Sequence, residues 1–197
     1  MTTSAPSPHP VKVLALVGSL RRGSYNRALL KESVGVKPPE MDVTEFDLRP
    51  VPFFDGDVEA QGDPAPVTQL KEAIRAADAL LIMTPEYHRS VPAVLKNAID
   101  WAGRDPKGKG VVSASLSGKP VGLLGTGGVA GTLHAQMHLR QILAETRSLV
   151  LAQPQVYVTF ARQKFDPNFK LTDEPTRAQL TDFMKALADW ARRLKAG

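Results

Sequence analysis

Five short apolar runs alternate with segments of helical spacing, and this alternation narrows the possible folds more than any other feature. The runs are Val11–Val17, Met41–Phe46, Ala79–Met83, Pro120–Gly125 and Leu149–Val158. Nearly continuous apolar runs are typical of strands buried on both faces, and long connections between them favour parallel pairing. We therefore predict an α/β protein with a five-stranded parallel sheet and helices on both faces.

The intervals between the runs carry the expected helices. These are Ser24–Gly35, Val67–Ala77, Val91–Gly103, Thr132–Thr146 and Glu174–Lys195. The last is the clearest, because apolar residues recur every three or four positions along it, and we interpret this stripe as core. The segment Pro50–Pro66 has no periodicity and is predicted to be an ordered surface loop, of a kind that could border the site.

Length and composition favour a single domain. The chain has 197 residues, 43% of them hydrophobic, which suits one domain over residues 11–197 after a disordered tail over residues 1–10. No apolar stretch approaches the ~20 residues of a membrane helix, and residues 1–10 lack a secretory signal, so we expect no membrane partner. The absence of cysteine excludes disulfides and thiolate catalysis and fits a cytoplasmic location.

The charge is basic but dispersed. The net charge of +5 includes no lysine or arginine tract, so we expect anionic small molecules rather than nucleic acid as ligands. The 4 histidines show no metal-ligand spacing, and no metal site is expected.

The turn Gly18–Arg27 follows the first apolar run and leads into a helix. A strand that ends in a glycine- and hydroxyl-rich turn gathers backbone N–H groups, hydroxyls and an arginine at one place, which suits a phosphate. The turn resembles a P-loop but lacks its lysine, which argues against an NTPase. The sequence therefore predicts a phosphorylated ligand.

Two further turns follow the third and fourth runs. Thr84–Pro92 offers an apolar wall from proline and tyrosine, and Gly125–Gly131 lets a flat ring approach the backbone. In a parallel sheet these turns meet the first one beyond the carboxyl ends of the strands. Taken alone, Thr84–Pro92 also fits an ordinary loop, and Gly125–Gly131 is a weak dinucleotide fingerprint because no acidic residue follows at the required place.

Two motifs carry a family resemblance. They are Gly18-Ser-Leu-Arg-x-x-Ser24-x-Asn26 and Pro85-Glu-Tyr-His-x-Ser-x-Pro92-x-x-Leu95-Lys96-Asn97-x-Ile99-Asp100-Trp101. Together they closely resemble the NADPH-dependent FMN reductase family of flavodoxin-like proteins, which includes quinone, azo-dye and chromate reductases. The similarity extends from about Val11 to the last helix, and it implies a flavodoxin-like fold.

The resemblance also implies the cofactor, FMN, and the residues around it. Ser19, Arg21, Ser24 and Asn26 are expected to hold the phosphate; Pro85, Glu86, Tyr87 and His88 to line the ribityl chain and ring edge; and Thr126, Gly127 and Gly128 to cover the other polar edge. It implies a homodimer or homotetramer with helices near the flavin between subunits.

Two positions depart from the family pattern. His88 stands where asparagine is frequent, and Arg89 stands where glycine is common. Arg89 either crowds the flavin ring or supplies a cation that binds a substrate, which is then the phosphate of NADPH or an anionic acceptor.

The expected function is transfer of two electrons from NADPH or NADH, through FMN, to a quinone, azo compound, metal oxyanion or free flavin. The flavin carries this chemistry, so no side chain is assigned a catalytic role. The alternatives are a flavodoxin-type electron carrier and a flavin-binding regulatory protein without NAD(P)H turnover.

Overall fold

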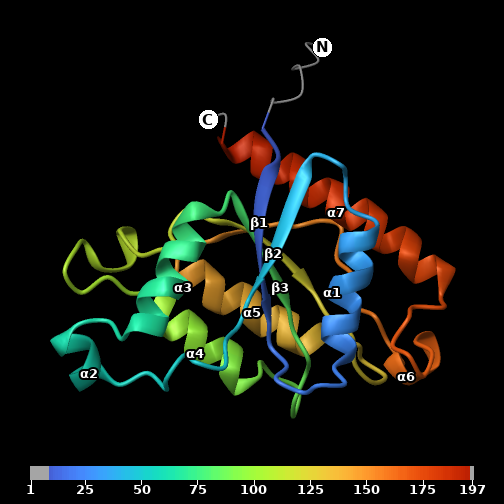
Figure 1. Ribbon diagram of the computed structural model, residues 1–197, viewed down its shortest axis with the longest axis horizontal. Coiled ribbons are helices and arrows are strands. Elements are labelled where there is room, and N and C mark those ends of the chain that lie inside the picture. Colours follow the sequence, from blue (N-terminus) through green and yellow to red (C-terminus); the bar gives the residue numbers. More distant parts are fainter. Residues whose placement is uncertain (1–8, 196–197) are drawn as a thin grey trace.

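The computed structural model describes residues 9–195, which form one parallel sheet flanked by helices (Figure 1). The strands are β1 (Val11–Val17), β2 (Met41–Phe46), β3 (Ala79–Met83), β4 (Pro120–Leu124) and β5 (Leu149–Val150). The helices are α1 (Tyr25–Gly35), α2 (Gly56–Gln61), α3 (Ala65–Ala76), α4 (Ala93–Ala102), α5 (Leu133–Glu145), α6 (Ala161–Lys164) and α7 (Glu174–Lys195), with a 3-10 turn η1 (Gly110–Val112).

The strand order is β2-β1-β3-β4-β5, and every neighbouring pair is parallel. The chain starts in β1, goes outward to β2, and then crosses to β3 on the other side of β1. In open parallel sheets a ligand crevice forms at such a reversal, beyond the carboxyl ends of the strands. The topology therefore places the expected site at the ends of β1 and β3.

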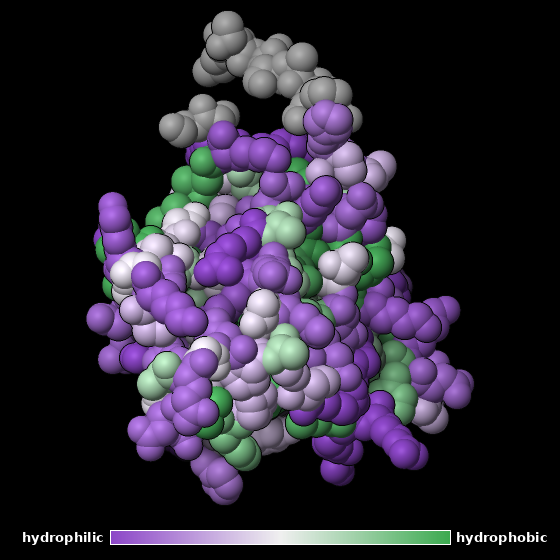
Figure 2. Space-filling view, turned by 60° about the vertical axis from the view of Figure 1, so that its left-hand side comes forward, coloured by the Kyte–Doolittle hydropathy of each residue, from purple (hydrophilic) through white to green (hydrophobic). Residues whose placement is uncertain are grey.

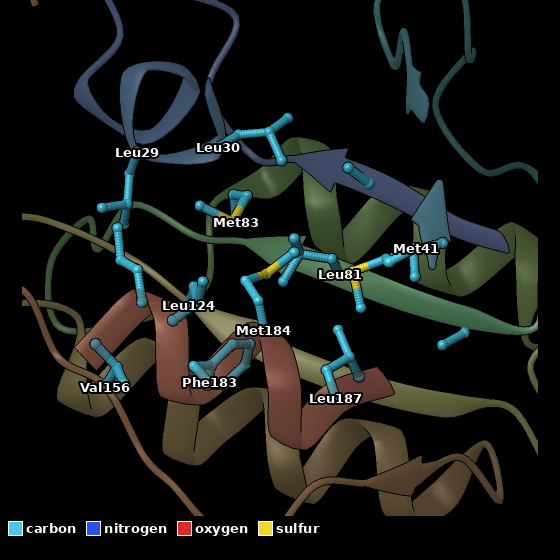
Figure 3. Close-up of a cluster of buried hydrophobic side chains, with 14 of the residues drawn as sticks. Leu29, Leu30, Met41, Leu81, Met83, Leu124, Val156, Phe183, Met184 and Leu187 are labelled. Carbon is cyan, nitrogen blue, oxygen red and sulfur yellow. The ribbon is translucent and has the colours of Figure 1, made fainter. Parts of the chain in front are cut away.

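Two hydrophobic layers cover the sheet. On one face, alternate residues of β1 and β3 pack with α1 and α7, where Leu29, Phe183 and Leu187 are almost completely buried (Figure 3). On the other face, α3, α4 and α5 pack through residues such as Leu70 and Leu139. Both faces of the central strands are thus removed from water, as the continuous apolar runs predicted.

The predicted elements are confirmed, with small differences at their ends and two corrections. The fifth strand was expected over Leu149–Val158, but β5 covers only Leu149–Val150 and pairing resumes at a single bridge between Thr126 and Val158. Pro154 interrupts this stretch, because proline has no N–H to donate to a strand neighbour. The second correction is α2, a short helix within the segment predicted as a loop, which begins at Gly56 after the capping residue Asp55.

Most of the expected tail, residues 1–10, lies outside the described residues. Among the residues that the structure describes, no helix is long and apolar enough to cross a membrane. The face of the molecule in Figure 2 is mainly hydrophilic, with only scattered hydrophobic residues.

Candidate functional site

A pocket of about 630 Å³ opens at the carboxyl ends of the central strands. It brings together residues from all three predicted turns. Its lining comprises Ser19, Arg21, Gly23, Ser24, Tyr25, Asn26, Pro85, Glu86, Tyr87, Thr126, Gly127, Gly128, Phe160, Ala161, Arg162, Gln163 and Phe169. Every predicted cofactor residue except His88 is among them, whereas no residue of Pro50–Pro66, the loop considered as a border of the site, lines this pocket.

The turn after β1 offers unpaired hydrogen-bond donors. Within residues 9–195, no protein acceptor takes a hydrogen bond from the backbone N–H of any residue in 19–26. The hydroxyl of Ser24 caps α1 by accepting from the N–H of Arg27 at 3.2 Å, and Ser19 is buried beside it. The positive end of the helix dipole adds to these donors. This end of the pocket therefore has the donors that a phosphate needs.

Asn26 links this turn to the loop after β4. Its side-chain amide donates to the carbonyl of Thr126 and its side-chain oxygen accepts from the N–H of the same residue, both at 3.0 Å. Asn26 and Thr126 are almost completely buried. The Asn26 side chain thus holds one wall of the pocket. Because these bonds occupy the side chain, its backbone N–H is the group of Asn26 that can donate to a bound anion.

The glycine-rich loop after β4 is packed tightly against its own chain. A Cβ at Gly127 would lie 2.3 Å from the carbonyl oxygen of Gly131, so only glycine fits there. The N–H of Gly127 donates to Val158, and its carbonyl accepts from Ala161. At Gly128 a Cβ would meet nothing within 4 Å, which leaves room for a ligand against the backbone.

The turn after β3 is a tight hairpin. Tyr87 and Ser90 exchange two backbone hydrogen bonds, of 3.2 and 3.0 Å, across His88 and Arg89. Both intervening residues are left-handed, with φ of 50° and 59°, the conformation that favours glycine or asparagine. Both are exposed and neither lines the pocket. The structure therefore places His88 and Arg89 at the tip of the hairpin rather than in the pocket wall.

Helix α5 holds the base of this hairpin. The Glu86 carboxylate accepts from the N–H of Ala135 at 3.0 Å and lies 3.1 Å from Nδ1 of His134. Oγ of Ser90 lies 3.0 Å from Nδ1 of His138, one helical turn further on. A carboxylate at a helix N-terminus is stabilised by the helix dipole. Glu86 thus anchors the hairpin on α5 as well as bordering the pocket.

One wall of the pocket was missed in the sequence. Phe160–Gln163 and Phe169 come from the segment between Val158 and α7. Phe160 and Phe169 both have a left-handed backbone conformation. The ring of Phe169 packs against that of Tyr25, with 5.2 Å between the ring centroids. The rule that ligands lie beyond strand ends applies to the fifth run as well, and its use there would have pointed to this segment.

The pocket fits FMN. Unpaired N–H groups, hydroxyls and Arg21 lie at one end and suit a phosphate, and Pro85, Tyr87 and the open backbone at Gly128 suit a flat ring with polar edges. When FMN is bound there, it supplies the redox chemistry.

Comparison with known proteins agrees with this geometry. Residues 11–163 match the family described as NADPH-dependent FMN reductase. The chain is 44% identical over 186 residues to an NAD(P)H-dependent FMN reductase of Pseudomonas aeruginosa, covering 94% of this chain and 97% of that protein. It is 38% identical over 183 residues to a 2-hydroxy-1,4-benzoquinone reductase of a Burkholderia species, covering 92% and 97%.

Among solved structures, FerB of Paracoccus denitrificans, a flavoenzyme NAD(P)H:(acceptor) oxidoreductase, superimposes with a TM-score of 0.82 and 34% identity over 92% of this chain and 97% of that one. This similarity supports a flavodoxin-like fold for the five-stranded sheet of this chain. The motifs, the pocket and these similarities lead to one conclusion: this chain belongs to the NADPH-dependent FMN reductase family, oxidoreductases that use FMN and NAD(P)H.

Proposed function

We propose that this protein transfers two electrons from NAD(P)H to a small acceptor, with quinones as the foremost class and azo compounds, metal oxyanions and free flavin as others. One observation carries the proposal: the phosphate-binding turn, the hairpin and the glycine-rich loop converge on one pocket. A single pocket cannot hold donor and acceptor against the same ring face together. They must therefore bind in turn.

The residues have distinct parts in this scheme. Ser19, Ser24 and Arg21 bind the FMN phosphate through hydroxyls, a guanidinium and neighbouring N–H groups. Pro85 and Tyr87 form the wall beside the ring. The backbone of Thr126–Gly128 covers a polar ring edge.

His88 and Arg89 act from the hairpin tip. Both are exposed beside Tyr87, which itself lines the pocket. We place His88 at the mouth as a hydrogen-bonding group toward the flavin edge, and Arg89 as a cation that contacts an anionic substrate as it enters.

Steady-state kinetics test the proposal. NADPH oxidation with benzoquinone should give parallel double-reciprocal plots, the pattern of a mechanism in which the first product leaves before the acceptor binds. Intersecting plots would contradict the shared pocket. Absence of turnover in FMN-loaded protein with several acceptors would instead support a flavodoxin-type carrier or a regulatory protein.

The protein is further proposed to act as a homodimer or homotetramer. Tyr87, Val129 and Met137 are 49%, 77% and 51% exposed. Tyr87 lines the pocket, Val129 follows the lining residue Gly128, and Met137 lies on α5, which holds the hairpin. Light scattering coupled to size exclusion should give at least twice the chain mass, and Met137→Glu should reduce it. A monomeric wild type would contradict the assembly. The lack of cysteine is consistent with the cytoplasm, which stays a prediction.

A further inference from the structure

A second hollow, of about 580 Å³, lies beside the flavin pocket. It is bounded by α1 with its preceding turn and by residues 168–170 of the segment between α6 and α7. Ser24 and Phe169 line both hollows, so the two adjoin at the first turn of α1. We call this second hollow the α1 groove.

The α1 groove is positively charged. Arg22, Lys31 and Lys170 line it and are exposed, and their side chains form no ion pair or hydrogen bond with any residue in 9–195. A groove lined by one sign of charge concentrates the potential and attracts ligands of the opposite sign.

The remaining charges of the groove are paired. Arg27 forms an ion pair with Glu45 at 2.8 Å. Glu32, the acidic residue of the lining, is bound by Arg177 at 2.7 Å. The negative charge in the groove is therefore neutralised by a cation from outside it, while three cations stay available for a ligand.

Phe169 forms an aromatic rim between the two hollows. A Cβ at Gly23 would lie 2.9 Å from its ring, so the glycine allows the ring to sit against the phosphate-binding turn. The residue is left-handed, with φ of 62°, and is 36% exposed. A left-handed non-glycine residue persists only where its surroundings hold it in place. The backbone of Phe169 is thus held in place, and its ring lies against Gly23 in the same lining as the cations.

We propose that the α1 groove binds the 2′-phosphorylated adenosine part of NADPH. Arg22, Lys31 and Lys170 would contact its phosphates, and the adenine would pack on Phe169. The adjoining lining lets one nucleotide reach the flavin pocket and the groove together. NADH lacks the 2′-phosphate, so the groove favours NADPH. This inference rests on the proposed use of NAD(P)H.

Calorimetry on the FMN-loaded protein tests the groove directly. The probes are adenosine 2′,5′-bisphosphate and adenosine 5′-monophosphate, and the test variant is Lys31→Gln combined with Lys170→Gln. Lys12→Gln is the matched control, because Lys12 is exposed on β1 at the opposite end of the sheet from the pocket. All substituted side chains are exposed, so the fold should be retained.

The double variant should bind the bisphosphate at least tenfold more weakly than the Lys12→Gln control, with a smaller change for the monophosphate. Its KM for NADPH should rise more than its KM for NADH, and its FMN content should stay unchanged. Equal bisphosphate affinity in the double variant and the control, or no binding to either, would overturn the inference.

Two further outcomes are informative. The first distinguishes NADPH from FAD as the source of the bound phosphate, and the second distinguishes a failure of the groove assignment from a failure of the proposed function. If the double variant loses affinity only for FAD, measured on flavin-free protein, the groove serves a flavin adenylate and the inference is overturned. If the lysines bind the bisphosphate but the protein does not oxidise NADPH, the groove's ligand class is upheld and the proposed function is overturned.

Discussion

Two buried asparagines hold distant loops in two regions of this molecule, and only one of these regions builds the pocket proposed for the flavin. Asn26, on α1, binds both backbone groups of Thr126. Asn97, on α4, accepts from the N–H of Phe54 at 2.7 Å and donates to the carbonyl of Pro52 at 2.8 Å. Both belong to the family motifs. A motif residue can therefore mark a structural clamp as readily as a ligand contact, and its surroundings decide which.

The largest expected effect is that of Asn26→Ala. It leaves the N–H and carbonyl of Thr126 buried without partners, each at a cost of about 1–3 kcal/mol, so unfolding should become easier by about 3 kcal/mol. The glycine-rich loop is released as well, and FMN affinity should fall at least tenfold. Urea unfolding and fluorescence titration of FMN measure the two effects.

Asn97→Ala is the matched control for that clamp. Its loss should be smaller, about 1–2 kcal/mol, since Trp101 still donates to the carbonyl of Pro52 at 2.9 Å. FMN affinity should not change. A comparable loss of FMN affinity in both variants would contradict the division between the two regions.

Arg21→Ala should have the next largest effect. A charge-assisted contact with phosphate contributes about 1.5–3 kcal/mol, so FMN should bind roughly tenfold more weakly or worse, and riboflavin should bind as in the wild type. Arg22→Ala is the neighbouring control, because Arg22 lines the α1 groove and not the pocket. Wild-type protein that binds riboflavin and FMN equally would refute the phosphate assignment.

The segment between Val158 and α7, which supplies Phe160–Gln163 and Phe169 to the pocket, differs from the two asparagine clamps because it ends at a carboxylate, Asp173, whose charge depends on pH. Asp173 accepts from the hydroxyl and the N–H of Thr176 at the start of α7, and it lies 3.4 Å from Nζ of Lys164. The hydroxyl of Thr176, its N–H and Lys164 hold the pKa of Asp173 below its usual value. A lowered folded-state pKa means that the carboxylate stabilises the fold above its usual pKa and that this contribution is lost as the pH falls through the folded-state pKa.

Asp173→Ala should therefore cost about 1 kcal/mol at pH 7, the usual cost of losing a helix cap. The difference from wild type should shrink as the pH falls below about 4 and vanish below the folded-state pKa. Chemical unfolding across that range measures it. Asp173→Asn, which keeps a capping oxygen, should retain most of the stability at pH 7.

Arg89→Gly should have the smallest effect, and of opposite sign. Glycine adopts the left-handed conformation without strain, so the protein should gain up to about 1 kcal/mol, or roughly 2–4 °C in Tm. Arg147→Gly is the control, since Arg147 is also exposed and left-handed, with φ of 61°, just after α5. Both should gain stability, but only Arg89→Gly should raise the KM for an anionic quinone. Identical kinetics would remove Arg89 from the substrate contacts.

Local patterns were sufficient for most of the fold. The apolar runs located the central strands, and the spacing of Leu180, Phe183 and Leu187 located α7 with the bounds that the structure has. These predictions succeed because the apolar run of a buried strand and the periodicity of an amphipathic helix are both patterns among residues close together in the sequence. The turn after β1 was equally local, since its strand, glycines and cap follow one another in the chain.

Tertiary structure alone decided how the pocket is assembled. Asn26 and Thr126 are 100 residues apart, and their pairing requires β1 and β4 to end at the same edge of the sheet. The chain likewise carries Phe169 back against Gly23, which adds a pocket wall that the sequence pattern did not predict and forms one side of the α1 groove. Sequence alone determines which residues can donate or accept a hydrogen bond or carry a charge. Long-range packing decides which of those groups are paired within the protein and which remain free to bind a ligand.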